Sequence, residues 1–224
     1  MREGTRPGER CPAEPGRRRA TAHRGSTVQV PMMQFHENRL EENEFYYSET
    51  DGLKALKLPY TGKEMSMIFL LPKDKSKGIS WLKKHVTKSE FETVQKEFEK
   101  RKMSRIKIPK FEYKVRYKEE LKSALKDLGM SAAFSPSEAN FSKMSPLGRK
   151  LFVQKVVHKA YVKVDEKGTE AAAVTAVVVV MSAPLNPKPS FVAAHPFMFL
   201  IKDEKTGSIL FMGSVANPQG EQVC

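Results

Sequence analysis

The chain has 224 residues and a mass of 25.4 kDa, which is enough for one sizeable domain or two small ones. Hydrophobic residues make up 40% and charged residues 29%, which excludes a collagen-like, low-complexity or wholly disordered chain. The net charge of +13 permits a nucleic acid, a polyanion or an acidic membrane as partner but requires none of them. The two cysteines, Cys11 and Cys224, are too few for a zinc site or a disulfide framework.

The basic charge changes character along the chain. Residues 1–26 contain seven arginines and no lysine, whereas from Val28 onward there are twenty-seven lysines and five arginines. The first segment has almost no large apolar side chain, so burial cannot offset the entropy of ordering it. We therefore predict a disordered tail over 1–27, a domain over 28–218 and a short C-terminal tail over 219–224. The first tail also lacks the apolar core of a secretion signal.

Strands and tight turns alternate in the first half of the predicted domain. Asp51 and Gly52 both tolerate positive φ, so this pair predicts a hairpin between its flanking strands. Two helices are expected to follow, and the second opens with a capping box made by Ser89 and Glu92. The expected strands are Val28–Met33, Glu44–Ser48, Leu53–Leu58 and Ser66–Leu71, and the expected helices are Gly78–His85 and Ser89–Lys102.

The second half adds strands of two kinds. Lys107–Tyr117 alternates around a break at Pro109, and Lys118–Leu128 has leucines at helical spacing before Gly129, a typical helix end. Near the C-terminus, Phe197–Ile201 and Ile209–Met212 are apolar on both faces, which is typical of strands at the centre of a core. The sequence therefore predicts an α+β fold with mainly antiparallel sheets and no internal repeat.

A long connection joins the strand that ends at Val164 to the one that starts near Phe191. Connections of this length are usually functional or disordered. From Thr169 every second residue is small to medium in size and uncharged, so the segment can lie exposed or enter a sheet as a strand with a compact buried face. The alternative from the residues alone is a buried strand, or an Ala-rich helix over Glu170–Ala176. No membrane-spanning helix is predicted, because the longest apolar stretch, Ala171 to Leu185, has fifteen residues and three interruptions.

The residues around this connection closely resemble the serpins. The similarity includes the strand and hinge of inhibitory members, the C-terminal signature, the closing strand and the central Val-Pro-Met-Met element. In this chain these elements are Val157–Ala160 with Val164–Ala172, Phe191–Ile201, Phe211–Pro218 and Val30–Met33. The resemblance implies a serpin-like partial fold that lacks the N-terminal half, because family members are much longer and their Val-Pro-Met-Met element lies near mid-chain.

The resemblance implies a protease inhibitor that acts as a suicide substrate and is not an enzyme. A reactive-centre loop is expected over about 166–190, and family spacing places the cleaved bond between Ser182 and Ala183, or between Met181 and Ser182. Such residues suit an elastase-like or chymotrypsin-like serine protease. His158 would be a buried shutter histidine at the base of the slot that receives the loop. The expected loop hinge consists of Glu166, Gly168, Thr169, Glu170, Ala171, Ala172 and Ala173.

Two further consequences follow from the resemblance. The slot would lack one bordering strand, so we expect impaired inhibition by this truncated chain. An extracellular location is expected from the family, with a cytoplasmic one as the alternative because no signal peptide is seen.

Other functional sites receive little support from the residues. The five histidines have no metal-ligand spacing, so no metal and no cofactor is predicted. Ser182, His158 and Asp165 could be combined into a triad, but no Gly-x-Ser-x-Gly elbow surrounds any serine. Two other functions stay open, a non-inhibitory serpin-like carrier and a basic nucleic-acid or polyanion binder. A glycosaminoglycan could bind a patch made of Lys83, Lys84, Lys107, Lys110 and Lys114, for which a solvated face is the alternative.

Overall fold

The computed structural model describes residues 17–21, 27–35, 40, 42–117, 119–165 and 187–219. These residues form two compact units. Unit 1 comprises Met1–Phe111 with Val164–Gln219, and unit 2 comprises Glu112–Lys163 with Gly220–Cys224. No helix among the described residues is long and apolar enough to cross a membrane.

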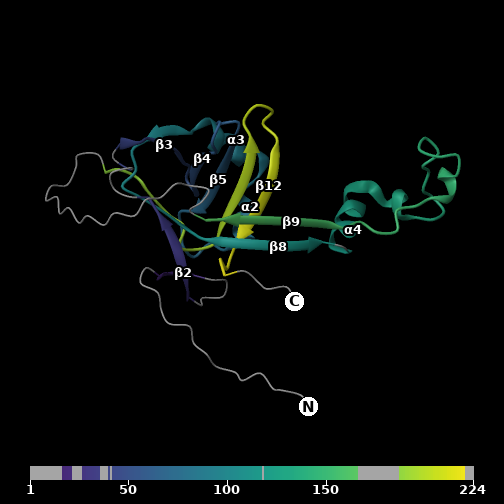
Figure 1. Ribbon diagram of the computed structural model, residues 1–224, viewed down its shortest axis with the longest axis horizontal. Coiled ribbons are helices and arrows are strands. Elements are labelled where there is room, and N and C mark those ends of the chain that lie inside the picture. Colours follow the sequence, from purple (N-terminus) through teal and green to yellow (C-terminus); the bar gives the residue numbers. More distant parts are fainter. Residues whose placement is uncertain are drawn as a thin grey trace, which may run out of the picture. The chain divides into compact units, whose positions relative to one another are not determined.

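A six-stranded antiparallel sheet lies at the centre of unit 1 (Figure 1). Its middle strand β5 (Met65–Pro72) is buried from Ser66 to Pro72, because the sheet is covered on both faces and every side chain of the strand meets a layer. The other strands are β3 (Phe45–Glu49), β4 (Leu53–Pro59), β6 (Glu99–Arg101), β11 (Phe197–Asp203) and β12 (Ile209–Val215), in the spatial order β12-β11-β5-β4-β3-β6.

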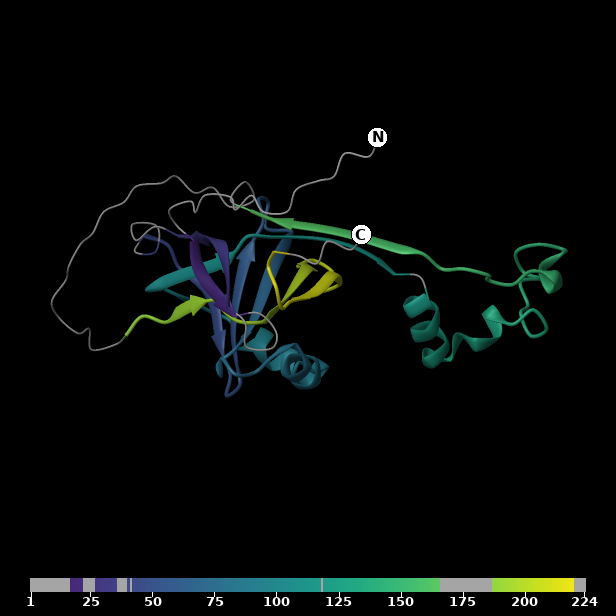
Figure 2. The same ribbon diagram turned by 90° about the horizontal axis from the view of Figure 1, so that it is seen from below.

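Two helices cover one face of this sheet, α2 (Ile79–His85) and α3 (Lys88–Lys96) (Figure 2). Leu82 and Val94 are fully buried there and belong to the same apolar cluster as Leu70 of β5. The second helix differs from the prediction at both ends. Its N-cap is Thr87, whose side chain accepts a hydrogen bond from the backbone N–H of Glu90, so Ser89 lies inside the helix. It ends at Lys96 because residues 99–101 pair with β3 as β6.

A second sheet in unit 1 has the strand order β1-β2-β7-β10. Its strands are β1 (Arg17–Thr21), β2 (Thr27–Gln34), β7 (Arg105–Pro109) and β10 (Ser190–Val192). The pairing of β1 with β2 corrects the tail prediction, because residues 17–21 belong to a sheet and not to a disordered segment. Backbone pairing supplies the hydrogen bonds, a contribution that composition alone does not reveal.

The predicted hairpin between β3 and β4 forms, but not for the expected reason. Neither Asp51 nor Gly52 has a positive φ. A Cβ at Gly52 would lie 2.7 Å from His85 Nε2 and 3.2 Å from Trp81 Cη2, so a larger residue there requires the His85 ring to shift. The positive φ values occur instead at the next turn, at Gly62 (87°) and Lys63 (59°).

Strands β8 (Phe111–Tyr117) and β9 (His158–Val164) form a two-stranded sheet, and they lie side by side in Figure 1. In unit 2 they are joined through α4 (Glu119–Leu125), a π turn over Lys126–Met130 and 3-10 turns at Ser131–Phe134 and Gly148–Lys150. The helix α4 has no buried residue, so the leucine face predicted for it is not packed into a core. Gly129 ends the helical stretch with a φ of 97°, as predicted for a C-terminal glycine.

Candidate functional site

The candidate site is the connection between β9 and β10, and the structure describes its two ends. The predicted hinge residues lie outside the described residues, as do both predicted cleavage positions, Met181-Ser182 and Ser182-Ala183. The hinge residues concerned are Glu166, Gly168, Thr169, Glu170, Ala171, Ala172 and Ala173. The described geometry therefore concerns how the connection leaves β9 and how it reaches β10.

The C-terminal end of the connection is held by backbone hydrogen bonds. The carbonyl oxygen of Pro189 accepts from the backbone N–H of Ser104 at 2.9 Å and from its hydroxyl at 3.1 Å. The Lys54 Nζ donates to the carbonyl oxygen of Ser190 at 3.4 Å. From Ser190 the chain then pairs in parallel with β7, beginning opposite Arg105. Two strands, β4 and β7, together with Ser104 just before β7, thus hold this end within four residues.

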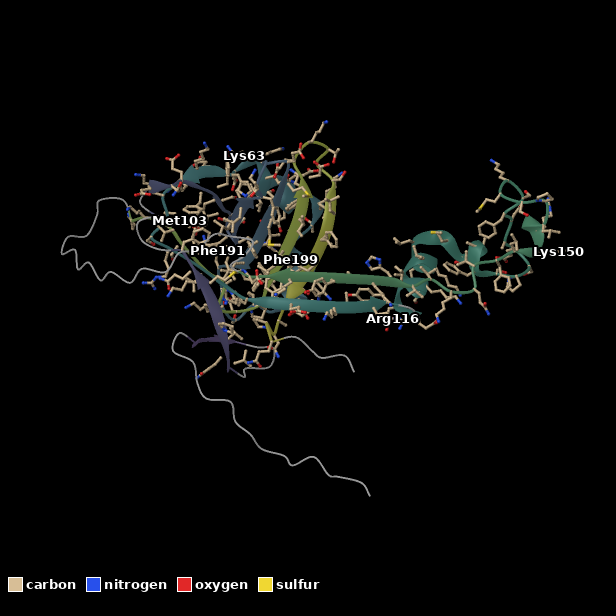
Figure 3. The ribbon with its side chains drawn as sticks, viewed as in Figure 1. Lys63, Met103, Arg116, Lys150, Phe191 and Phe199 are labelled. Carbon is tan, nitrogen blue, oxygen red and sulfur yellow. The ribbon has the colours of Figure 1, made fainter. Side chains whose placement is uncertain are left out.

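Burial of Phe191 adds an apolar anchor to the same end. Its side chain is 0% exposed, and its ring centroid lies 6.5 Å from that of Phe69 on β5. Figure 3 shows Phe191 and Phe199 among the crowded side chains of unit 1. Phe199 itself packs 5.2 Å from Phe111, and Phe197 lies between the two groups, 6.0 Å from Phe69 and 5.9 Å from Phe111. The start of β10 is therefore part of the aromatic layer beneath the central sheet.

A buried histidine secures the chain just beyond β10. The ring Nε2–H of His195 donates a hydrogen bond to the carbonyl oxygen of Pro72 at 2.8 Å, and the residue is 7% exposed. Burial lowers the pKa of His195 below its ordinary value, although the hydrogen bond to Pro72 opposes this change. The neutral imidazole therefore bridges the end of β5 to the turn before β11.

The N-terminal end of the connection is held much less firmly. It leaves from β9, whose residues alternate between exposed and half-buried and include no buried side chain. Among the described residues, β9 has β8 as its sole neighbour in the sheet, which leaves its second edge open. One contact across this pair places Lys114 Nζ 5.4 Å from the Tyr161 ring centroid, and both of these residues are exposed.

His158, at the start of β9, does not occupy the core position predicted for it. Its side chain is exposed, and its ring stacks on Tyr117 of β8 with 6.4 Å between centroids and 15° between planes. The expectation that His158 is buried in the core is therefore wrong for the part of the chain that the structure describes. Its assignment as a shutter residue stays a prediction.

The five lysines considered as one glycosaminoglycan patch are not all at the surface. Lys107 is 5% exposed within β7. Lys83 and Lys84 are exposed in the last turn of α2. Lys107 lies on β7, an inner strand between β2 and β10, and its side chain is buried.

Two residues that anchor the connection were not identified from the sequence. Ser104 and Lys54 contact Pro189 and Ser190 across 85 and 136 residues of chain, respectively. Neither residue belongs to a motif, and a serine or lysine beside a strand has no local signal for such a contact. Only the tertiary fold brings these pairs together.

Comparisons with known proteins agree with this architecture. A family model described as Serpin (serine protease inhibitor) matches residues 18–218. Serpin-ZX of Hordeum vulgare is 42% identical over 202 residues, which are 87% of this chain and 48% of that relative. Intracellular coagulation inhibitor 1 of Tachypleus tridentatus is 36% identical over 203 residues, 89% of this chain and 46% of that relative. Among solved structures, native protease nexin-1 with heparin has a TM-score of 0.74 at 28% identity.

The match to protease nexin-1 covers 91% of this chain and 51% of the protease nexin-1 chain, so nearly all of this chain is matched but only about half of protease nexin-1. The chain spans about half the length of the relatives it matches. The family model covers both ends of the candidate connection, the β9 strand and the anchor at β10. On these grounds the chain belongs to the serpin family.

Proposed function

We propose that this chain acts as a serpin-type bait for serine proteases, cleaved within the 166–190 connection. The observation that supports this proposal is the difference between the two ends of the connection. One end is anchored by Phe191 and the Pro189 hydrogen bonds, whereas the other continues a strand with an open edge. After cleavage, the segment before the cut would stay joined to β9 and would no longer be connected to the anchored start of β10.

The proposed reaction uses the nucleophile of the protease. Its serine oxygen attacks the carbonyl carbon of Ser182, or of Met181 in the alternative register, and forms an ester with it. The peptide bond breaks as the proton of the protease's serine hydroxyl passes to the leaving nitrogen, and the new amine stays on Ala183, or on Ser182, at the anchored side. The other side, now esterified to the protease, remains covalently joined to β9. Pairing of this segment along the open edge of β9 is a form of strand addition.

The small residues of the hinge suit such pairing. Thr169, Ala171 and Ala173 alternate along the chain, so in an extended conformation they share one face. A charged side chain at Thr169 would be buried or would clash as the segment enters the sheet. The hinge composition therefore favours fast pairing once the loop is cut.

In the chain by itself, pairing with β9 would provide backbone hydrogen bonds along one edge of the inserted segment. Among the described strands, β9 can pair with it on one side, and none is available to pair on the other. A strand paired on one side gains about half the ladder hydrogen bonds and leaves a new open edge. We therefore propose that hydrolysis of the ester competes strongly with trapping, and that the chain behaves mainly as a substrate.

The residue types in the connection favour particular proteases. No lysine or arginine lies between Gly168 and Ser182, which disfavours a trypsin-like pocket. Serine and methionine at the predicted bond suit elastase-like and chymotrypsin-like pockets. These assignments rest on the sequence of the connection and the spacing of related proteins.

Incubation with elastase, chymotrypsin and trypsin tests the proposal. We expect elastase or chymotrypsin to cut between Met181 and Ala183, as measured by mass spectrometry of the products, with a small fraction of complex stable in SDS. Thr169→Arg should abolish that fraction while the rate of cleavage stays within about twofold, because attack precedes pairing. The control Thr169→Ser should keep both. Cleavage elsewhere in the chain, with the 166–190 connection intact, would refute the proposal.

A glycosaminoglycan remains a second candidate partner for this chain. The support is the solved structure of the relative protease nexin-1 with heparin, together with the exposed Lys83 and Lys84 beside His85 in α2. This smaller basic surface replaces the five-lysine patch. Retention on a heparin column that Lys83→Gln and Lys84→Gln together reduce would support it.

A further inference from the structure

One face of the two-stranded sheet in unit 2 carries only exposed side chains. From Glu112 to Arg116 and from Lys159 to Lys163, exposed residues alternate with half-buried ones, so each strand turns its exposed set to one side. The Lys114 Nζ of β8 lies 5.4 Å from the Tyr161 ring centroid of β9, which places both sets on the same face. We call it the ribbon face, and its residues are Glu112, Lys114, Arg116, Lys159, Tyr161 and Lys163.

The ribbon face is strongly positive. Four of its six side chains are cations and one is a carboxylate. That carboxylate, on Glu112, lies 3.4 Å from the Nζ of Lys114, whose side chain is 77% exposed. An ion pair so open to water contributes little free energy, so Lys114 can exchange Glu112 for another anion. The rest of unit 2 adds to the positive field, because residues 112–163 contain eleven lysines and arginines against five acidic residues.

Tyr161 lies at the centre of this positive face. Lys159 and Lys163 flank it two residues away on either side, which is about 7 Å along β9, and Lys114 lies across from it on β8. The Tyr161 ring is 52% exposed, so its π surface stays open to a ligand. Figure 3 shows the side chains along these two strands, with Arg116 labelled near the end of β8. The ribbon face therefore combines an open aromatic ring with cations on both strands.

We propose that the ribbon face binds single-stranded nucleic acid, with one base stacked on Tyr161 and the neighbouring phosphates bound by the cations around it. Proteins bind single strands without reading their sequence by combining a positive surface that follows the backbone with aromatic rings that stack on the bases. Lys159 and Lys163 are about 13 Å apart along β9, so the face contacts a few nucleotides. We therefore expect binding that is weak at physiological salt and that strengthens as the salt concentration is lowered.

Other polyanions fit this face less well. A sulfated glycosaminoglycan offers negative charge to the lysines, but it has no aromatic base to stack on Tyr161. In a duplex the bases are already stacked on one another, so the ring gains a base only at the cost of opening the duplex. The ribbon face is also distinct from the edge of β9 along which the cut loop is proposed to pair, so this inference does not rest on the proposed function.

The test uses the full chain with fluorescein-labelled oligo(dT) and oligo(U), each of about 20 nucleotides, and measures binding by fluorescence anisotropy over a range of salt concentrations. Lys159→Gln together with Lys163→Gln should lower the affinity by about tenfold or more at ~0.05 M salt. The slope of log K against log salt concentration should become shallower by about 1.4, because each lost phosphate contact removes about 0.7. Tyr161→Ala should lower the affinity about fivefold or more with an unchanged slope, whereas Tyr161→Phe should bind as the wild type does.

Lys143→Gln together with Lys150→Gln is the matched control, because both lysines are exposed in unit 2 outside the ribbon face and the change in charge is the same. Lys150 is labelled in Figure 3, in the turn Gly148–Lys150. This control should bind as the wild type does, and circular dichroism checks that each variant is folded. Tighter binding of one of the two oligonucleotides shows whether the face prefers DNA or RNA.

Four results would overturn the proposal. The first is a wild type that binds neither oligonucleotide, and the second is equal weakening by the two double variants, since net charge alone would then explain the binding. The third is wild-type affinity in Tyr161→Ala, or a loss of heparin binding in that variant by the same factor, since the ring would then act without a base. The fourth is a duplex of the same length that binds as tightly as the single strand.

Discussion

Substitution of Phe191 measures how much burial at the start of β10 contributes to the free energy of unfolding. It is 0% exposed and packs against Phe69 on β5. Phe191→Ala removes a whole buried ring, and such changes lower the free energy of unfolding by about 3–5 kcal/mol. For a urea m-value of about 2 kcal/mol per molar, the transition midpoint should fall by about 1.5–2.5 M.

The single tryptophan makes this measurement specific to unit 1. Trp81 stacks on His85 in α2 at 4.2 Å between ring centroids and packs against the same sheet that Phe191 underlies, so its fluorescence reports the unfolding of that unit. Val192→Ala is the control, because Val192 is half-buried on the same strand and its substitution should cost about 1 kcal/mol or less. A loss below about 1 kcal/mol for Phe191→Ala would show that β10 is not anchored by burial.

Two further substitutions test neighbouring contacts by the same urea titration. Burial lowers the pKa of His195, and the nearby Lys75 lowers it further, whereas the Pro72 hydrogen bond and Asp74 oppose this change. Below about pH 6.5 the unfolded chain therefore binds the proton more readily than the folded one, so the free energy of unfolding decreases as the pH is lowered. His195→Gln should therefore lose less of its midpoint between pH 7 and pH 5 than the wild type, and an equal loss would contradict this. Gly213→Ala places a Cβ 2.6 Å from two atoms of the Phe199 ring and should destabilise unit 1 by about 1–3 kcal/mol, whereas wild-type stability would mean that the ring can move aside freely.

Local patterns in the sequence predicted most strands of unit 1 to within two residues. Apolar alternation and turn residues are local signals, and the strands β2, β3, β4 and β5 follow them. The length of α3 was overestimated for a tertiary reason, since residues 99–101 gain more from pairing with β3 than from another helical turn. The strand β1 was missed because Arg17–Thr21 has no apolar pattern and is ordered by the backbone of β2.

The sequence predicted where the candidate connection lies in the chain, but not which residues hold its C-terminal end. The length and the small residues of the connection were visible in the sequence, whereas Ser104 and Lys54 became evident only through contacts across the fold. His158 was misplaced because alternation along β9 predicts a strand with two faces, and nothing local decides whether either face is covered. Burial of a face depends on which other elements are present to cover it.

The same dependence explains why β9 and β12 matter together. Each has one sole neighbour among the described strands, β8 and β11 respectively. Strand pairing at β12 would extend the central sheet that contains β11 and β5, whose burial positions Phe191 beneath them. The fixed end of the candidate loop depends on this central sheet, while the fate of the cut loop depends on what lies beside β9. Cleavage needs neither edge to be paired, whereas the trapping that we propose needs the cut loop to pair along β9 and gain a partner on its other side, so we expect the chain by itself to be cut more readily than it traps.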